Sequence, residues 1–481
     1  MQEFDTQVQL IKYTILREVA KYMIKEGTGD FSTAFNRFDD IAAEIVKDKP
    51  TMRCCIYKER AIVSQRIRLA IGGNKNNSNI IEVVDIACDD CPAGGYTVTD
   101  SCRGCIAHRC AAACKVGAIS FDENQKCVID KDKCVNCGRC ASVCPYSAIA
   151  DRHRPCEKAC KIGAIHRDKE TDAAKIDNDK CIACGACVYQ CPFGAINDKS
   201  FICNVIDFLE KSKKGGGRVY AVVAPSIATQ FVNHDLGKII AAIKKAGFSK
   251  VFEAALGADM VALLESKELA EKGFLTSSCC PAFVKYVQNA FPALAENISH
   301  NLSPMAQIGK AIKEKDPESC VVFIGPCTAK KAEVQLEKAK QYIDAVLTFE
   351  ELQALIDAYE IDVDSLESDE LENATYFGRI FARSGGVSEA VVKAAQEQSL
   401  DLEVNPCVCN GITECRTALL RASKGVLKNN FIEGMACDGG CVGGAGCLTH
   451  HQTAADAAKI NKHASEQKEI TITQAVEGFK L

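Results

Sequence analysis

Thiols dominate the chemistry available to this chain, because 30 of its 481 residues are Cys. Two stretches follow the pattern C-x2-C-x2-C-x3-C-P, and their thiols are Cys134, Cys137, Cys140 and Cys144 in the first and Cys181, Cys184, Cys187 and Cys191 in the second. Such a run supplies three thiolates to one cubane and its last Cys to a partner cluster. A structural zinc site would instead show isolated C-x2-C pairs, often with His. The runs therefore predict [4Fe–4S] clusters.

The Cys-rich block also contains an internal duplication. The segment Cys110-Ala-Ala-Ala-Cys114-Lys-Val-Gly-Ala-Ile recurs as Cys156-Glu-Lys-Ala-Cys160-Lys-Ile-Gly-Ala-Ile, and each copy precedes one of the two runs. The spacing between each copy and its run is the one that joins the two halves of a ferredoxin unit. On these residues the block resembles a polyferredoxin domain.

Two pairings of the thiols remain open. A nested pairing forms four clusters, with ligand sets Cys102, Cys105, Cys110 and Cys144; Cys114, Cys134, Cys137 and Cys140; Cys160, Cys181, Cys184 and Cys187; and Cys88, Cys91, Cys156 and Cys191. The alternative exchanges Cys144 and Cys191 between the two runs and leaves an irregular remainder. We favour nesting, because it uses every one of these thiols.

A second group of thiols follows short apolar runs that we expect to be strands. The run 274–276 leads into Cys279-Cys280-Pro281, and the run 321–324 leads into Pro326-Cys327 and Lys330. Ligands of open α/β sheets bind beyond the carboxyl ends of the strands, so these loops should converge. Farther along, Cys437 and Cys441 lie among glycines that let a bulky inorganic group approach the backbone.

At these residues the chain resembles the [FeFe]-hydrogenases over 217–450. The carriers of the resemblance are Ser278-Cys279-Cys280-Pro281, then Pro326, Cys327 and Lys330, and then Met435-Ala436-Cys437 with Gly439, Gly440 and Cys441. The resemblance implies a [4Fe–4S] cube held by Cys280, Cys327, Cys437 and Cys441. It further implies that Cys441 bridges to a di-iron unit carrying CO, cyanide and a dithiolate, that Lys330 and Ser226 contact the cyanides, and that Met435 packs on the metal.

The same resemblance implies a proton path through Cys279, Glu265, Ser303 and Glu268. Glu265 and Glu268 are three residues apart, which places both on one face of a helix. Each transfer needs a titratable or hydroxyl group within hydrogen-bond reach of the next one. We therefore expect these four side chains to lie in sequence between the metal and the surface.

The implied reaction is 2H⁺ + 2e⁻ ⇌ H2, with electrons from a soluble ferredoxin and a di-iron unit installed by maturation proteins. Rival interpretations are a hydrogen sensor, an iron–sulfur assembly protein and a plain electron carrier. Three departures from the family pattern indicate a divergent branch: Gly325 where a Met is frequent, Phe283 in place of a Trp, and Cys447 after the glycines that follow Cys441.

Composition sets the frame for these sites. A 47% share of hydrophobic residues supports sizeable cores, and a net charge of -5 leaves no polybasic surface for nucleic acid or lipid headgroups. No apolar run suits a membrane span, so we expect a cytoplasmic chain without a membrane partner.

We expect a multidomain fold of the α+β and α/β classes. Its parts are a helical module (1–85), a ferredoxin-like domain (86–210), a two-lobed catalytic domain with parallel sheets (218–460) and a tail (461–481). Strands are expected at 219–223, 274–276 and 321–324, and helices at 236–246 and 303–315. Cys407, Cys409 and Cys415 suggest a further metal set without an evident fourth ligand.

Overall fold

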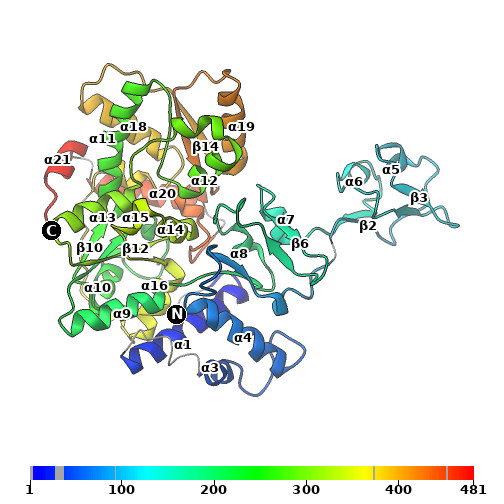
Figure 1. Ribbon diagram of the computed structural model, residues 1–481, viewed down its shortest axis with the longest axis horizontal. Coiled ribbons are helices and arrows are strands. Elements are labelled where there is room, and N and C mark those ends of the chain that lie inside the picture. The colour runs from blue at the N-terminus through cyan, green and yellow to red at the C-terminus, as the bar shows by residue number, and fades with distance from the viewer. Residues whose placement is uncertain (1–3, 28–36, 93, 372–373, 451–452, 468) are drawn as a thin grey trace.

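The computed structural model describes residues 4–27, 37–92, 94–371, 374–450, 453–467 and 469–481. Figure 1 shows a broad body made of the catalytic lobes and the N-terminal helices, from which an arm bearing β2, α5, β3 and α6 projects. None of the described helices combines the length and apolar character that a membrane crossing requires.

The first lobe is built on a four-stranded sheet in which every pairing is parallel. Its strands are β9 (Val219–Val223), β10 (Lys250–Glu253), β12 (Cys320–Gly325) and β13 (Ala345–Thr348), in the order β10-β9-β12-β13. Every residue of β9 is buried, as expected for a parallel strand covered on both faces. The predicted strands at 219–223 and 321–324 are confirmed.

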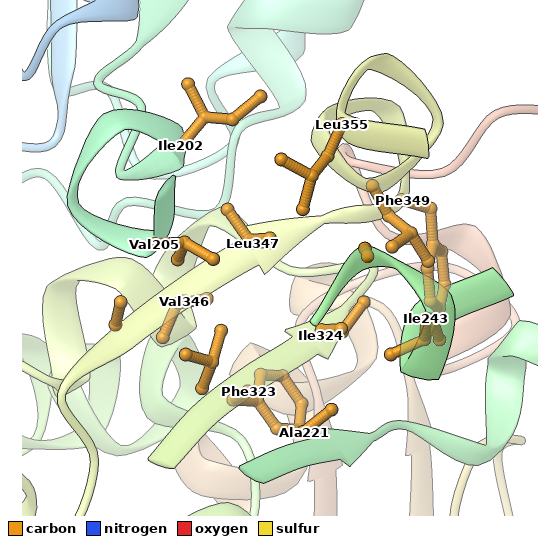
Figure 2. Packing of buried hydrophobic residues seen from close by; sticks show 14 of the residues in the cluster. Ile202, Val205, Ala221, Ile243, Phe323, Ile324, Val346, Leu347, Phe349 and Leu355 are labelled. Atoms are coloured by element: carbon orange, nitrogen blue, oxygen red, sulfur yellow. The ribbon is translucent and has the colours of Figure 1, made fainter. Parts of the chain in front are cut away.

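Helices cover both faces of this sheet. They include α9 (Ile202–Lys213), α10 (Leu236–Ala246), α13 (Pro304–Lys315), α14 (Thr328–Glu333), α15 (Glu337–Lys340) and α16 (Phe349–Ala358). Figure 2 shows Ile202 and Val205 of α9 beside the β13 residues Val346 and Leu347. Because α9 packs on β9 and β13, the core of this lobe begins well before residue 218, the expected start of the domain. The predicted helix at 236–246 is confirmed, and the one at 303–315 begins at Pro304 behind the N-cap Ser303.

The second lobe contains a three-stranded parallel sheet in the order β11-β15-β14. Its strands are β11 (Leu275–Thr276), β14 (Pro406–Asn410) and β15 (Phe431–Met435), and its helices are α12 (Pro281–Ala290), α17 (Tyr376–Ile380), α18 (Gly386–Glu397) and α19 (Ile412–Ser423). The long helix α11 (Ala254–Lys272) packs on α13, α17 and α18. It therefore runs through the interior between the lobes.

The helices at both ends of the chain are part of the catalytic body. The N-terminal helices are α1 (Gln7–Glu26), α3 (Phe38–Ile45) and α4 (Ile56–Ala70), and α1 packs on α16 and α9 within the main hydrophobic core. The expected module 1–85 thus has no separate core. After α20 (Thr453–Ala464), α21 (Ile472–Glu477) packs on α11 and α18, so the expected tail 461–481 is docked.

The Cys-rich block forms two units of like topology, one inserted within the other. In the outer unit β1 (Ile81–Val83) pairs with β8 (Ile196–Asp198), and β6 (Ile165–Arg167) pairs with β7 (Ala174–Ile176). In the inner unit β2 (Tyr96–Val98) pairs with β5 (Ile149–Asp151), and β3 (Ile119–Phe121) pairs with β4 (Cys127–Ile129). The short helices are α5 (Arg109–Ala112), α6 (Arg139–Ser142), α7 (Pro155–Ala159) and α8 (Ala186–Gln190). This backbone order is the nested one.

Candidate active site

The loops that follow the parallel strands converge between the two lobes. In the first sheet the direction of strand order changes between β9 and β12, the position where α/β sheets bind ligands. Ser226 follows β9, and Cys327 follows β12. In the second sheet Cys280 follows β11 and Cys437 follows β15, so both sheets aim their carboxyl ends at one centre.

Four thiols gather at this centre as expected. Burial raises the pKa of Cys441 to about 12, and the neighbouring charges of Cys327 and Cys280 add to the rise. Burial likewise raises the pKa of Cys437 well above its usual value, with Cys327 and Cys280 again the nearest charges. Among the described residues no three such side chains converge as they would on a single metal ion. A cubane differs because it spreads its four thiolates over separate corners.

The thiols of Cys280, Cys327 and Cys441 border an apolar cavity. Its lining includes Cys279, Met435, Met305, Phe381 and small residues of α11. Next to Pro225 of this lining, the Ser226 hydroxyl is fully buried and has no hydrogen-bond partner. An apolar cavity with thiols at its edge, and with an unpartnered hydroxyl on the residue after its Pro225, fits a metal unit with small polar ligands.

Phe323 explains the departure at Gly325. A Cβ placed on Gly325 would lie 2.6 Å from the Phe323 ring, and that ring also lines the cavity. The aromatic side chain two residues earlier therefore occupies the space that a side chain at 325 would need. Sequence reasoning missed Phe323, because its apolar neighbours in β12 do not distinguish a pocket-facing ring from a core ring.

Lys330 and Cys279 lie together at the cavity wall. The Lys330 amine donates a hydrogen bond to the backbone oxygen of Cys279 (3.2 Å) and forms an ion pair with Glu333 (2.7 Å). Burial disfavours the charge on Lys330, but the Glu333 carboxylate outweighs it and raises the pKa of Lys330. Burial also raises the pKa of Cys279 well above its usual value, and the nearby charge of Glu265 acts in the same direction.

Glu265 is fully buried behind Cys279. Its Oε1 accepts hydrogen bonds from the Ser278 N–H (3.0 Å) and hydroxyl (3.1 Å). Its Oε2 is buried without a donor. Burial raises the pKa of Glu265 to about 7, and the hydrogen bonds from Ser278 only partly oppose that rise. At neutral pH this carboxyl can therefore both release and take up a proton.

The hydroxyl next to Glu265 belongs to Ser299, which corrects the expectation for Ser303. Ser299 donates its single O–H to Glu268 Oε2 (3.0 Å) and also lies close enough to Glu265 to lower the pKa of Glu265. Ser303 instead accepts the Ala306 N–H (3.5 Å) as the N-cap of α13. The structure thus places Ser299 between the two glutamates.

Glu268 completes the line toward the surface. Burial alone would raise the pKa of Glu268, but the Lys272 amine and the His300 N–H outweigh burial and lower it. The ion pair with Lys272 measures 2.8 Å. Because His300 is largely exposed, this end of the line is within reach of solvent.

The outer accessory unit brings its thiols together in two sets. Cys88, Cys91, Cys156 and Cys191 form what we call the junction group, since burial and then the charges of Cys191, Cys88 and Cys91 raise the pKa of Cys156 to about 12. Cys160, Cys181, Cys184 and Cys187 form the proximal group, in which burial followed by the charge of Cys181 raises the pKa of Cys184 to about 12. These two sets match the nested pairing.

One backbone device recurs four times in the block. The N–H four residues after Cys114, Cys144, Cys160 and Cys191 donates to the sulfur of that Cys at 3.2–3.4 Å. Each turn needs a left-handed residue one position earlier, with φ near +60° at Gly117, Gly163 and Gly194 and +50° at Ser147. Such N–H···S hydrogen bonds are one of the factors that set the reduction potential of a cluster.

For the inner unit, the predicted pairing of the thiols into two ligand sets stays a prediction. Helices α5 and α6, which carry Cys110 and Cys140, pack together, and the sulfur of Cys102 accepts the Cys127 N–H at 3.4 Å. His108 stacks on Phe121 with ring centroids 3.7 Å apart. His153 is bonded to Asp151. The two histidines are thus held by partners other than thiols.

The proximal group touches the catalytic centre. The Thr328 hydroxyl, directly after Cys327, donates to the Ala183 oxygen, directly before Cys184, at 2.7 Å. A cavity of about 560 Å³ is bordered by the proximal thiols and by Ala436. Farther round, the buried Cys415 thiol donates to the Met435 oxygen at 3.5 Å, which supports the chain beside the cavity.

Comparisons with known proteins agree with this geometry. Residues 217–445 match the model of the iron-only hydrogenase large subunit, C-terminal domain, residues 101–148 match a 4Fe-4S dicluster domain, and residues 174–197 match a 4Fe-4S binding domain. Iron hydrogenase 1 of Clostridium pasteurianum is 32% identical over 68% of this chain. The matched part covers 65% of the length of that relative.

The periplasmic [Fe] hydrogenase large subunit of Nitratidesulfovibrio vulgaris is 31% identical over 66% of this chain and 85% of its own length. A solved [FeFe]-hydrogenase from Chlamydomonas reinhardtii covers 54% of this chain and 87% of its own at 19% identity, with a TM-score of 0.44. The residues that match the family model include those that surround the thiol-edged cavity. The chain therefore belongs to the iron-only, or [FeFe], hydrogenase family.

Proposed function

We propose that this chain catalyses 2H⁺ + 2e⁻ ⇌ H2 at a di-iron unit attached to a [4Fe–4S] cube. The observation that carries the proposal is the set of Cys280, Cys327 and Cys441 at the edge of an apolar cavity that also exposes Cys279 and Lys330, with Cys437 close to these three thiols. In this assignment the four thiolates would hold the cube, and Cys441 would also serve as a ligand of the di-iron unit. When bound, that unit, with its CO, cyanide and dithiolate ligands, supplies the site where protons and electrons combine.

The residues around the cavity have distinct tasks. The Lys330 amine and the unpartnered Ser226 hydroxyl would hold the cyanide ligands, and Met435 would pack against the unit. The apolar walls exclude water, which strengthens these polar contacts. The same exclusion makes a built-in proton path necessary.

Protons travel along Cys279, Glu265, Ser299 and Glu268. Glu265 lies beside the Ser299 hydroxyl, and Ser299 donates its O–H to Glu268 Oε2 (3.0 Å), so this hydroxyl can relay a proton between the two carboxyls. Glu268 then exchanges with solvent beside Lys272. Each step uses an acid or hydroxyl next to its acceptor, so no water file is needed between Glu265 and Glu268.

Electrons enter through about four accessory cubes, from the exposed inner unit to the proximal group and then to the catalytic thiols. A soluble ferredoxin is the donor that we assign to the inner unit. Maturation proteins install the di-iron unit. The contact between Thr328 and Ala183 supports the last transfer, because it holds the proximal loop against the loop of Cys327.

Infrared spectroscopy of the anaerobically matured full chain tests the proposal. We expect CO and cyanide bands together with H2 evolution. Cys441→Ser should lose both, since a hydroxyl is a poor bridging ligand, while the accessory clusters keep their EPR signals. Cys320→Ser, at the opposite end of β12, is the matched control and should retain the bands. Absence of the bands in the wild-type chain, or full activity of Cys441→Ser, would refute the assignment.

A further inference from the structure

The junction group lies where the inner unit joins the outer unit. The two connecting segments run side by side, with the Arg152 N–H bonded to the Gly95 oxygen (2.8 Å) and Arg154 Nε bonded to the Pro92 oxygen (3.0 Å). These contacts fall directly after Cys91 and directly before Cys156. An electron that leaves the inner unit for the proximal group therefore meets the junction group first.

A buried guanidinium approaches the junction group from this connection. The Arg154 side chain is 1% exposed, and its Nη1 lies 3.8 Å from the Cys88 sulfur. Its Nη2 pairs with Asp172 at 3.1 Å, but half of the Asp172 side chain is in solvent. The Ala174 N–H adds a second donor to the Cys88 sulfur at 3.3 Å.

A second buried guanidinium comes from the N-terminal helix α4. Arg66 is 7% exposed and donates to the Phe193 oxygen (2.8 Å), while its Nε and Nη1 have no partner. It lies on Gly194, where a Cβ would come within 2.8 Å of Nη2. Gly194 belongs to the turn whose next N–H holds the Cys191 sulfur. Burial lowers the pKa of Arg66 to about 10, which still leaves it charged at neutral pH.

The other charges nearby do not repeat this arrangement. Arg53 stacks over the Phe193 ring at 5.2 Å, but it is paired with Asp89 (3.2 Å) and Asp90. The buried Lys199 of the outer unit is paired with Glu82 at 3.2 Å. Among the described residues, Arg66 is thus the buried cation of this block that has no carboxylate bonded to it.

We propose that Arg66 and Arg154 give the cluster of the junction group the most positive reduction potential of the accessory clusters, so that it takes the first electron and stores it. The proposal rests on the accessory cubes proposed above and is independent of the catalytic chemistry. Arg66 and Arg154 would act on the reduction potential of this cluster without being its ligands.

The physical reason is the charge that reduction adds. A [4Fe–4S]²⁺ cluster accepts one electron from the inner unit, takes up no proton, and becomes more negative by one charge. Two cations within the dry shell stabilise that reduced state, whereas burial by itself opposes it. The proximal group has no arginine of this kind among the described residues, and Lys330 beyond it is already paired with Glu333. The arginine substitutions themselves therefore measure the effect of these charges on the junction group.

EPR-monitored redox titration of the full chain, produced without maturation proteins, tests the proposal. The earliest signal to appear on reduction should vanish in Cys156→Ala. In Arg66→Gln that signal should move to more negative potential, with at least a tenfold lower ratio of reduced to oxidised cluster at the wild-type midpoint, which is about 59 mV for one electron. Arg154→Gln should shift the same signal in the same direction, and Arg66→Lys should restore most of it.

Arg139→Gln is the matched control, because Arg139 adjoins Cys140 but is exposed. All midpoints should stay in place in that variant. Survival of the earliest signal in Cys156→Ala would overturn the proposal, as would unchanged midpoints in both glutamine variants. The infrared bands and H2 evolution of the matured chain are separate readouts, so failure of the hydrogenase assignment would be recognised independently.

Discussion

Replacing Glu265 by Gln should stabilise the folded chain at alkaline pH while it stops proton transfer. The Gln carbonyl can accept the two hydrogen bonds that Ser278 donates to Oε1, and its amide can fill the place of the unpartnered Oε2. The substitution therefore removes the titrating charge and little else. A carboxyl kept only for packing would not combine a gain in stability with a loss of turnover.

The size of the effect follows from the pKa of Glu265, which burial raises from 4.5 to about 7. Below pH 4.5 the carboxyl is protonated in both states, and its full contribution to stability is present. Between 4.5 and 7 the unfolded chain releases the proton while the folded chain keeps it, so stability falls as the pH rises. At about 1.4 kcal/mol for each pH unit, the loss above pH 7 amounts to about 3 kcal/mol.

Anaerobic chemical denaturation followed by circular dichroism measures this difference. From about pH 4.5 to 7 the free energy of unfolding of the Gln variant should rise relative to wild type, and above pH 7 the difference should level off about 3 kcal/mol above its value at acid pH. Glu271→Gln, exposed on the same helix α11, should show no such trend. A difference between Glu265→Gln and wild type that stays constant with pH would refute the assignment of a buried, titrating carboxyl, whatever the H2 rate.

Three further outcomes are expected. Iron analysis of the chain without its di-iron unit should give about 20 irons for five cubes, and about 12 would show that only three cubes assemble. Ser299→Ala should reduce H2 evolution at least tenfold with the CO and cyanide bands intact, whereas Ser303→Ala should cost about 1 kcal/mol of stability as a lost N-cap and leave the rate near wild type; the reverse result would restore the path expected from sequence. Lys331→Met should destabilise the fold by about 3–5 kcal/mol in denaturation experiments, because the buried Glu351 (2.8 Å) would lose its ammonium partner and the buried Asp198 (2.7 Å) would keep only Lys12 (2.7 Å); an effect under about 1 kcal/mol would mean that Lys12 and the remaining hydrogen bonds compensate for the lost amine.

The residues that could be read from sequence are those whose chemistry is local. Cluster ligands occur at fixed spacings along one loop, so the C-x2-C-x2-C-x3-C-P runs identify their thiols without tertiary information. The strand at 219–223 was equally accessible, since a fully apolar run between a glycine-rich turn and a proline has few alternatives. In both cases the signal and the structure occupy the same short stretch of chain.

The sequence predictions that differ from the structure concern features that depend on packing between distant segments of the chain. Ser303 precedes Pro304, which is typical of an N-cap, and only the position of the loop after 298 relative to α11 brings Ser299 to Glu268 instead. The amphipathic pattern of the N-terminal helices shows that each helix buries one face. It does not show which part of the chain covers that face. That face is shared with the catalytic sheet, so the expected boundary at residue 85 does not exist as a gap between cores.

The side-by-side linkers of the inner unit have a consequence for how such chains change over time. Because the chain leaves the outer unit and returns to it at adjacent points, bonded through Gly95 and Arg152, the inserted unit can be removed or exchanged by closing a short gap. The catalytic body and the thiols of the outer unit would stay in register. The distance to which the inner unit projects from the body of the protein is therefore set by an insertion that is separate from the thiol-edged cavity.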